Sequence, residues 1–287
     1  MFTFCYSYLP LSGPINVVQN LCFQGYYPFQ LIKIYILLKQ LCNTWAAGGF
    51  KIRIIPAEAR YYRDKGWVKS YFLLSYSDYY DPKNLNFGSL RAFNEFILEQ
   101  GKGFSSHPHA EVEITTIVLE GEITHEDNMG NRGVVGKEEV QCITTGRGIE
   151  HSEFNRGKEP LRFYQIWISP YKNNLEPTYS KMKFEPSGWK NRLLPLASGQ
   201  GFEDALKINA DATVYRASLE KENKLHFNSK EGRFVFIYIS TGELSVNGQS
   251  LGRGDQARFD EEETIHLETA TFAELVLIDV PVNHGNI

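Results

Sequence analysis

Short runs of β-branched and aromatic residues, separated by turn clusters, dominate the sequence from Lys51 to its end. The expected strands are Ile114–Leu119, Glu122–His125, Val140–Thr144, Arg162–Ile168, Arg233–Ser240, Leu244–Val246 and Phe272–Val280. Asn247-Gly248 is a strong two-residue hairpin signal. Helical periodicity is weak, and Leu90–Gln100 is the best helix candidate. Many short strands at close spacing predict an all-β sandwich or barrel.

The composition is that of a folded globular chain. Its 287 residues carry a formal net charge of −4, and 42% of them are hydrophobic. These values argue against disorder, collagen and disulfide-rich miniproteins. A pI near 6.0 gives no electrostatic footprint for nucleic acid or for an anionic membrane. Four cysteines without a C-x-x-C spacing argue against both a disulfide framework and a structural zinc cage.

Residues 1–50 differ from the rest in composition. They contain no Asp or Glu, and their only charged residues are Lys33 and Lys39. A secretory signal has a positive charge before its apolar run, and no positive charge precedes the apolar run here. Leu31–Leu41 is too short, and too interrupted by lysine, to span a bilayer. The extension is either an apolar segment that packs on the domain or on a partner, or an upstream sequence without an evolved role.

The remaining chain is expected to form two domains, residues 51–175 and 176–287. Tyr171–Gly199 is richer in Pro, Asn, Lys and Ser than its surroundings and is a candidate connector between two β units. The lack of a signal segment and the low cysteine content of the body predict a cytoplasmic location.

Two paired motifs could hold a metal ion. His107-Pro108-His109 is an H-x-H pair, and His151-Ser152-Glu153 is an H-x-E pair. Because strand side chains alternate between faces, each pair points one way, and two adjacent strands would aim four donors at one interior point. Three neutral imidazoles and one carboxylate suit a divalent first-row metal with open positions. The alternative is two unrelated surface or core pairs.

These motifs resemble the two cupin motifs, Gly101-x5-His107-x-His109-x3-Glu113 followed by Gly121, and Gly148-x2-His151-x3-Asn155. More narrowly, the chain resembles the pirin family. The matching stretches are Gly66-Trp67, Tyr79-Tyr80-Asp81-Pro82, Phe87-Gly88-Ser89-Leu90-Arg91, His107-Pro108-His109, Leu119-Glu120-Gly121, His125-Glu126-Asp127, Thr145-Gly146-Arg147-Gly148-Ile149 and His151-Ser152-Glu153. The match begins near residue 51 and leaves residues 1–50 outside.

The resemblance implies two cupin (jelly-roll-like) β-barrels in tandem, with one metal ion in the N-terminal barrel. The ligands that it implies by motif position are His107, His109, His151 and Glu153. It implies Fe(II) as the expected ion, with Mn, Ni, Cu, Co or Zn as alternatives. Two departures from the general cupin pattern leave this assignment intact. The spacer from Glu113 to Gly121 is seven residues rather than six, and Gly146 occupies the motif's proline position.

Two further residues could support the site. Glu113 shares strand parity with His109. In many cupins the corresponding carboxylate is a metal ligand, whereas here Glu113 is expected to orient a histidine, with a solvated strand-end carboxylate as the other alternative. His125 precedes a turn and is expected to be an exposed hairpin histidine, with a place beside the metal ligands as the alternative.

The resemblance implies oxygenase chemistry on a flavonol-like aromatic with dioxygen, as in pirins with quercetin 2,3-dioxygenase activity. Glu153 would be the catalytic residue that accepts the proton of the substrate's 3-hydroxyl. Phe104 and Phe163 are expected to form an apolar wall at the mouth of the site, whereas Trp167 is expected in the barrel core.

The competing hypothesis is a metal- or redox-sensing regulatory protein that acts through protein partners, because no basic face marks a nucleic-acid site. A cavity beside the metal would favour the enzyme, and a sealed site would favour regulation. In the second β unit, His226 and the His266/Glu268 pair form a poor cage, which predicts a degenerate cupin without a metal. Cys142 is expected to be a small core residue rather than a nucleophile.

Overall fold

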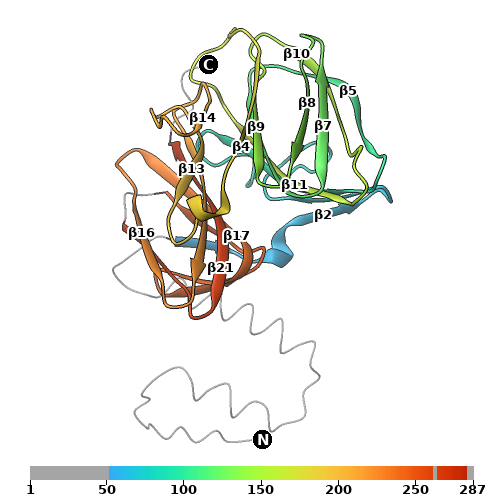
Figure 1. Ribbon diagram of the computed structural model, residues 1–287. Helices are drawn as coiled ribbons and strands as arrows, with labels where there is room; N and C mark the ends of the chain where they lie inside the picture. Colours follow the sequence, from blue (N-terminus) through green and yellow to red (C-terminus); the bar gives the residue numbers. More distant parts are fainter. Residues whose placement is uncertain (1–51, 261–263, 283–287) are drawn as a thin grey trace, which may run out of the picture. The chain divides into compact units, whose positions relative to one another are not determined.

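A computed structural model describes residues 52–260 and 264–282, so the apolar extension lies outside the described residues. The described chain consists of 21 strands and two short 3-10 helices, η1 (Ala57–Ala59) and η2 (Pro186–Gly188). The strands form two sheet-rich halves (Figure 1). The expected all-β fold of two cupin barrels is therefore confirmed. Among the described residues, no helix has the length and apolar character needed to cross a membrane.

The N-terminal barrel consists of two facing sheets. In spatial order, the seven-stranded sheet contains β12 (Thr178–Lys183), β9 (Glu139–Thr144), β6 (Glu113–Glu120), β11 (Leu161–Ile168), β4 (Leu90–Leu98), β3 (Val68–Phe72) and β2 (Tyr61–Asp64). The four-stranded sheet contains β5 (Gly103–His109), β10 (Ile149–Phe154), β7 (Glu122–Asp127) and β8 (Arg132–Gly136). Phe96 and Phe163 from the first sheet pack with Ile123 and Val135 from the second, so one apolar core fills the space between the two sheets.

The C-terminal barrel is built on a ten-stranded sheet. Its main path is β1 (Ile52–Ile55), β19 (Gln256–Phe259), β17 (Arg233–Val246), β21 (Phe272–Pro281), β15 (Thr213–Glu220), β13 (Leu194–Ser198) and β14 (Leu206–Lys207). Off this path lie β16 (Lys224–Asn228), β18 (Gln249–Gly252) and β20 (Thr264–Glu268). Asn247 and Gly248 join β17 to β18 with φ of 48° and 77°, which confirms the predicted hairpin turn.

The outer face of the seven-stranded sheet packs against the C-terminal barrel. Phe93 stacks on Phe236 with ring centroids 5.6 Å apart, and Tyr164 meets Tyr238 edge-on at 5.5 Å. The Tyr238 hydroxyl donates a hydrogen bond of 2.9 Å to the buried Glu95 carboxylate. Because this sheet has an apolar core on each face, its central strands β6, β11 and β4 are buried on both sides.

Burial on both faces explains one wrong prediction. The helix expected over Leu90–Gln100 is the strand β4, which pairs with β11 and β3. Leu90 and Phe93 face the core between the barrels, whereas Phe96 and Leu98 face the core of the N-terminal barrel. A strand with apolar residues on both faces does not show the alternation of apolar and polar residues that identifies a half-buried strand. The spacing of its apolar residues therefore resembles that of a helix.

The chain passes from one barrel to the other twice, before the first strand and after the last strand of the N-terminal barrel. β1 pairs with β19 in the C-terminal barrel before the N-terminal barrel begins. The candidate connector Tyr171–Gly199 is more ordered than its composition indicated. Within it, β12 pairs with β9 of the N-terminal barrel, and β13 pairs with β15 of the C-terminal one. The domain division at residue 175 stays a prediction.

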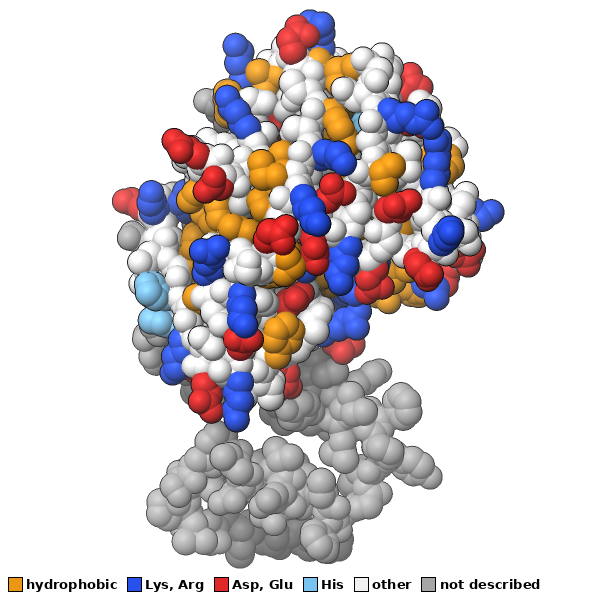
Figure 2. Space-filling view, in the orientation of Figure 1, with side chains coloured by type: hydrophobic (Ala, Val, Ile, Leu, Met, Phe, Trp, Pro, Cys, Tyr) orange, Lys and Arg blue, Asp and Glu red, His pale blue; other side chains and the backbone are white. Residues whose placement is uncertain are grey.

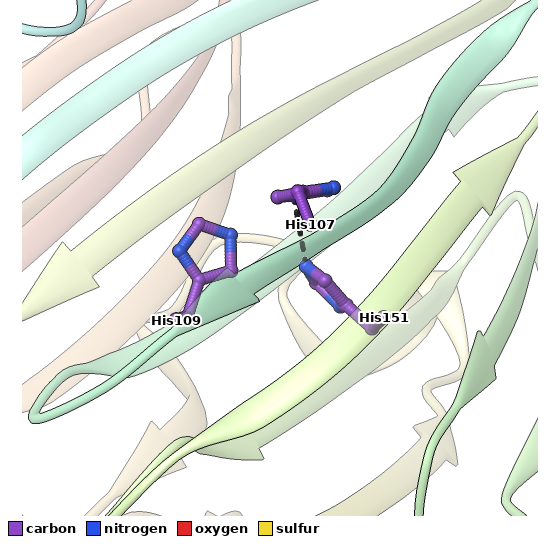
Figure 3. A group of neighbouring side chains, drawn as sticks. All are labelled: His107, His109 and His151. Atoms are coloured by element: carbon purple, nitrogen blue, oxygen red, sulfur yellow. Dashed lines mark hydrogen bonds between the residues drawn. The ribbon is translucent and has the colours of Figure 1, made fainter.

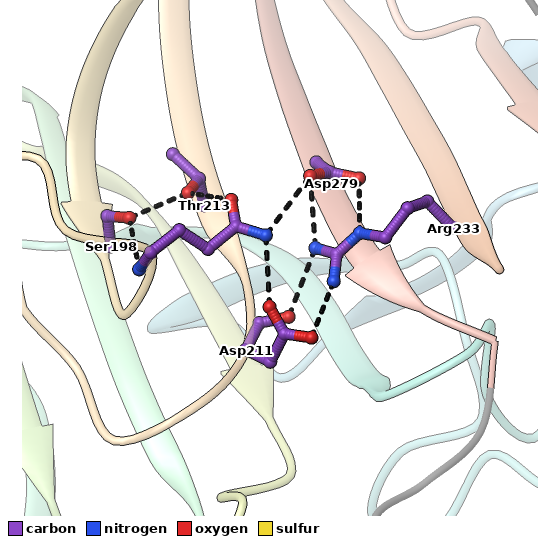
Figure 4. A network of polar contacts seen from close by, with 6 residues as sticks. Ser198, Asp211, Thr213, Arg233 and Asp279 are labelled. Carbon is purple, nitrogen blue, oxygen red and sulfur yellow. Dashed lines mark hydrogen bonds and ion pairs between the residues drawn. The ribbon is translucent and has the colours of Figure 1, made fainter. Parts of the chain in front are cut away.

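A polar network joins four strand ends of the C-terminal barrel (Figure 4). Arg233 binds Asp279 through two hydrogen bonds of 3.0 Å each, and its third nitrogen lies 2.8 Å from Asp211. Gln200 donates to Asp211 and accepts from Thr213, which links β13 and β15 to the ion pair. Arg233 and Asp279 are both largely buried, so each charge depends on its partner.

We predict that Asp279→Ala lowers the free energy of unfolding by about 3 kcal/mol, because it leaves a buried guanidinium with less compensation. Urea denaturation followed by fluorescence measures this change. Lys190→Ala is the matched control, since it removes an exposed ion pair with Glu220 and is expected to cost less than about 1 kcal/mol. Equal losses in the two variants would contradict the role given to burial.

Candidate metal centre

The antiparallel pairing of β5 with β10 brings the two histidine motifs together. His151 lies directly opposite His107, and His109 lies opposite Ile149. The three imidazoles point toward one another from the two strands (Figure 3), and their ring centroids are 4.6–4.9 Å apart. One donor nitrogen from each ring lies within 4.8 Å of the other two. The three histidines predicted from the sequence therefore converge.

Glu153 lies in a second group of donors that overlaps the first. The register of β10 on β5 shifts here because β5 has one extra residue between Phe104 and His107, whereas His151 and Glu153 keep the regular i, i+2 spacing on β10. Glu153 is 1% exposed, and its carboxylate falls in a second group of donor atoms, again within 4.8 Å, with His125 and His151. His151 belongs to both groups. The four predicted ligands thus surround one region, together with His125.

Two amide side chains hold the Glu153 carboxylate. Gln141 on β9 donates to Oε1 at 2.7 Å, and Gln165 on β11 donates to Oε2 at 3.0 Å. The Trp167 indole N–H donates to Gln165 Oε1 at 3.2 Å, which fixes the orientation of that amide. Sequence reasoning missed both glutamines. The available signal was a lone amide among apolar neighbours, on the strand face that points into the barrel.

The electrostatics of the site favour a bound cation. Burial, followed by the neighbouring histidines, lowers the pKa of His109 to about 4 and that of His151 to about 3. Both imidazoles are therefore neutral at physiological pH and keep a lone pair for a metal. Burial raises the pKa of the Glu153 carboxyl, while the nearby histidines oppose that rise. A buried carboxylate among neutral imidazoles lacks a counter-charge, which a divalent metal ion would supply.

His125 and Glu113 differ from expectation. His125 is 0% exposed, so its interpretation as an exposed hairpin histidine is wrong, and its ring centroid lies 5.3 Å from that of His151. Glu113 is also buried, which excludes a solvated carboxylate. Its Oε2 accepts hydrogen bonds from the Thr144 hydroxyl and from the Asn209 backbone N–H rather than from a histidine. Glu113 thus connects the N-terminal barrel to a loop of the C-terminal one.

Two of the three aromatic residues considered near the site occupy positions other than the predicted ones. Phe104 flanks His107 with ring centroids 6.4 Å apart, as a wall residue should. Phe163 is fully buried in the barrel core against Phe96, so its expected place at the mouth is wrong. Trp167, expected in the core, is only partly buried and meets His109 edge-on at 4.8 Å. Phe104 and Trp167 are therefore the aromatic neighbours of the histidines.

A surface hollow adjoins one of the three histidines, His109. Its volume is about 520 Å³, within the range of small-molecule sites, and His109 is part of its lining. The other lining residues are Pro108, Ala110, Asn128, Arg147, Gly148, Ile149 and Glu150. Because His107 and His109 are themselves only partly buried, the histidine group is reachable from outside.

The other candidate residues lie away from this centre. His226 and His266 face each other across β16 and β20 and are exposed, and histidines appear on the surface of the C-terminal barrel in Figure 2. Cys142 is buried in the core between the barrels, where burial raises the pKa of its thiol to about 12. Its predicted role as a core residue is confirmed. Basic and acidic side chains are interspersed over the visible face (Figure 2).

Comparison with known proteins identifies the family. A family model for pirin matches residues 56–168. The quercetin 2,3-dioxygenase of Escherichia coli strain K12 is 36% identical over 232 residues, which cover 80% of this chain and 99% of that protein. The chain belongs to the pirin family. A pirin-like protein of Caulobacter vibrioides is likewise 36% identical, over 75% of this chain and 94% of its own length.

The second barrel and the solved structures agree with this membership. Residues 195–280 match the model of a quercetinase C-terminal cupin domain. The crystal structure of the pirin YhhW from Escherichia coli superimposes with a TM-score of 0.76 at 34% identity, covering 81% of this chain and 99% of that one. A second structure of that pirin is a complex with nickel(II), with a TM-score of 0.75 at 33% identity and coverage of 80% and 99%.

We predict that Gln165→Met lowers the affinity of this pirin for a divalent metal ion by about 10–100-fold, because Glu153 loses one of its two orienting donors. Competition with a chromogenic chelator measures the affinity. Gln249→Met, on the exposed part of β18, is the control and should leave it unchanged. Unaltered affinity in Gln165→Met would show that the amide does not position the carboxylate.

Proposed function

We propose that this pirin is a metal-dependent dioxygenase that opens the ring of a flavonol-like substrate. His107, His109, His151 and Glu153 would hold one divalent first-row metal ion. The observation that carries the proposal is the convergence of His107, His109 and His151, with the buried Glu153 carboxylate in an overlapping group that shares His151 and a hollow of about 520 Å³ adjoining His109. The relatives named quercetin 2,3-dioxygenase support the substrate class and dioxygen as the second substrate.

The choice of metal rests on the donor set and on the family. Imidazole and carboxylate donors suit Fe(II), which we propose as the native ion, and they also suit Mn, Ni, Co, Cu and Zn. Nickel(II) is the ion named for the related Escherichia coli pirin. A bound ion would supply Lewis-acid activation of the substrate hydroxyl and redox chemistry toward dioxygen.

Glu153 is the proposed catalytic residue. Each of its oxygens accepts one hydrogen bond from a glutamine amide, which leaves a further lone pair on each oxygen to bind the metal ion or to accept a proton. The proton of the substrate's 3-hydroxyl would pass to a carboxylate oxygen of Glu153, whose raised pKa makes it a better base than a solvated carboxylate. Two amides from two different strands, one on each oxygen, hold the carboxylate in place, so little reorganisation accompanies the transfer.

The surrounding side chains would orient the substrate. Phe104 and Trp167 flank His107 and His109 and offer apolar faces for a planar aromatic ring system. The rim of the cavity carries the polar groups of Asn128, Arg147 and Glu150, which suit the hydroxyls at the edge of a polyphenol. The cavity favours this enzymatic role over the competing one, a metal- or redox-sensing regulator that acts through protein partners.

We predict turnover of quercetin by the full chain after anaerobic reconstitution with Fe(II) and admission of air. Loss of the flavonol absorbance, together with release of carbon monoxide, measures the reaction. Glu153→Ala should lower kcat by about 100-fold or more, because it removes the proton acceptor and one ligand. His226→Ala, which removes an exposed histidine of the other barrel, should leave kcat unchanged.

The metal content of His109→Ala separates the two parts of the proposal. After gel filtration, this variant should retain little metal, since three remaining donors hold the ion poorly. Near-stoichiometric metal would overturn the ligand assignment. A filled wild-type site without turnover, tested with several metals, would instead contradict the dioxygenase and favour the regulatory role.

A further inference from the structure

The metal centre contains two overlapping groups of donors rather than one. The outer group is His107, His109 and His151, of which the first two are only partly buried. The inner group is His125, His151 and Glu153, and all three are buried. His151 is common to both groups. The inner group is therefore the more remote from the cavity that adjoins His109.

His125 has the surroundings of a metal ligand. Its Nε2 lies 3.1 Å from Asp127 Oδ2, while its Nδ1 is buried and has no hydrogen-bond partner in the described part of the chain. Metal-ligating histidines commonly donate one ring N–H to a carboxylate, which leaves the other nitrogen with its lone pair for the metal. A histidine that only filled the core would leave that buried nitrogen unsatisfied.

The orientation of the His125 ring is fixed on two sides. The Tyr179 ring stacks on it with centroids 4.4 Å apart and an interplanar angle of 9°. Asp127 is itself held by the side-chain amide of Asn131 at 2.8 Å and by two backbone N–H groups of its own turn. The carboxylate and the imidazole thus form a preorganised pair on β7, next to His151 and Glu153 of the paired strand β10.

We propose that His125 is a further metal donor, and that the centre offers an inner position formed by His125, His151 and Glu153. This inference rests on the proposed metal binding of the site. An ion in the inner position is withdrawn from the cavity, whereas an ion in the outer position lies beside His109 and the substrate's route. Because His151, and with it Glu153 of the proposed ligand set, would serve both positions, one ion occupies one position at a time.

The test is a Co(II) titration of the full-length variant His107→Ala/His109→Ala, followed by visible absorption. Two donors of the outer group are lost, so this variant should still take up one equivalent of Co(II), with an affinity lower than that of the wild type by at least 10–100-fold. Binding this weak would be lost during gel filtration but is seen in the titration. Adding His125→Phe, which keeps the stacking on Tyr179 but removes both nitrogens, should abolish the uptake.

Two further variants complete the experiment. His226→Phe in the same background removes an exposed histidine and should leave the uptake intact. Asp127→Asn keeps His125 but weakens its orientation, and it should lower the affinity without abolishing folding. If the double variant takes up no Co(II) while the wild type does, the inner position is wrong and the proposed function stands. If the wild type itself takes up none, the proposed function fails.

Discussion

The antiparallel pairing of β5 with β10 places His151 opposite His107, and the metal centre depends on that register. A shift of one residue would turn the paired side chains to the other face of the sheet and disperse the donors. The register is held from both sides, because β10 also pairs with β7 along His151–Phe154. The same pairing with β7 brings His125 opposite Glu153. One strand therefore organises both histidine motifs and the residue that sequence reasoning placed at the surface.

The seven-stranded sheet of the N-terminal barrel supplies the hydrogen-bond donors that orient Glu153. Gln141 and Gln165 reach across the barrel from β9 and β11 to the Glu153 carboxylate. Their strands are buried on both faces, because the C-terminal barrel covers the outer face of this sheet. The C-terminal barrel thus contributes to the centre indirectly, as a rigid backing for the strands that hold the glutamines. Buried hydrogen bonds of this kind are strong where water is excluded.

The sequence predicted the parts of this centre that follow from strand periodicity. The H-x-H and H-x-E pairs indicated adjacent strands and convergent donors, and the structure brings His107, His109 and His151 together. Glu113, His125 and Phe163 could not be placed from parity alone, because parity gives the face of a strand and not what covers it. β4 was mistaken for a helix for the same reason, since its burial on both faces depends on a sheet-to-sheet contact formed by distant residues. The amide support of Glu153 likewise depends on a contact across the barrel.

X-ray absorption spectroscopy of the full chain, reconstituted with one equivalent of Fe(II), tests the central claim most directly. The account predicts first-shell scattering from nitrogen and oxygen only, with the multiple-scattering signature of three imidazoles and one carboxylate oxygen. Sulfur in the first shell, or fewer than three imidazoles, would contradict the claim that these four side chains form one metal centre.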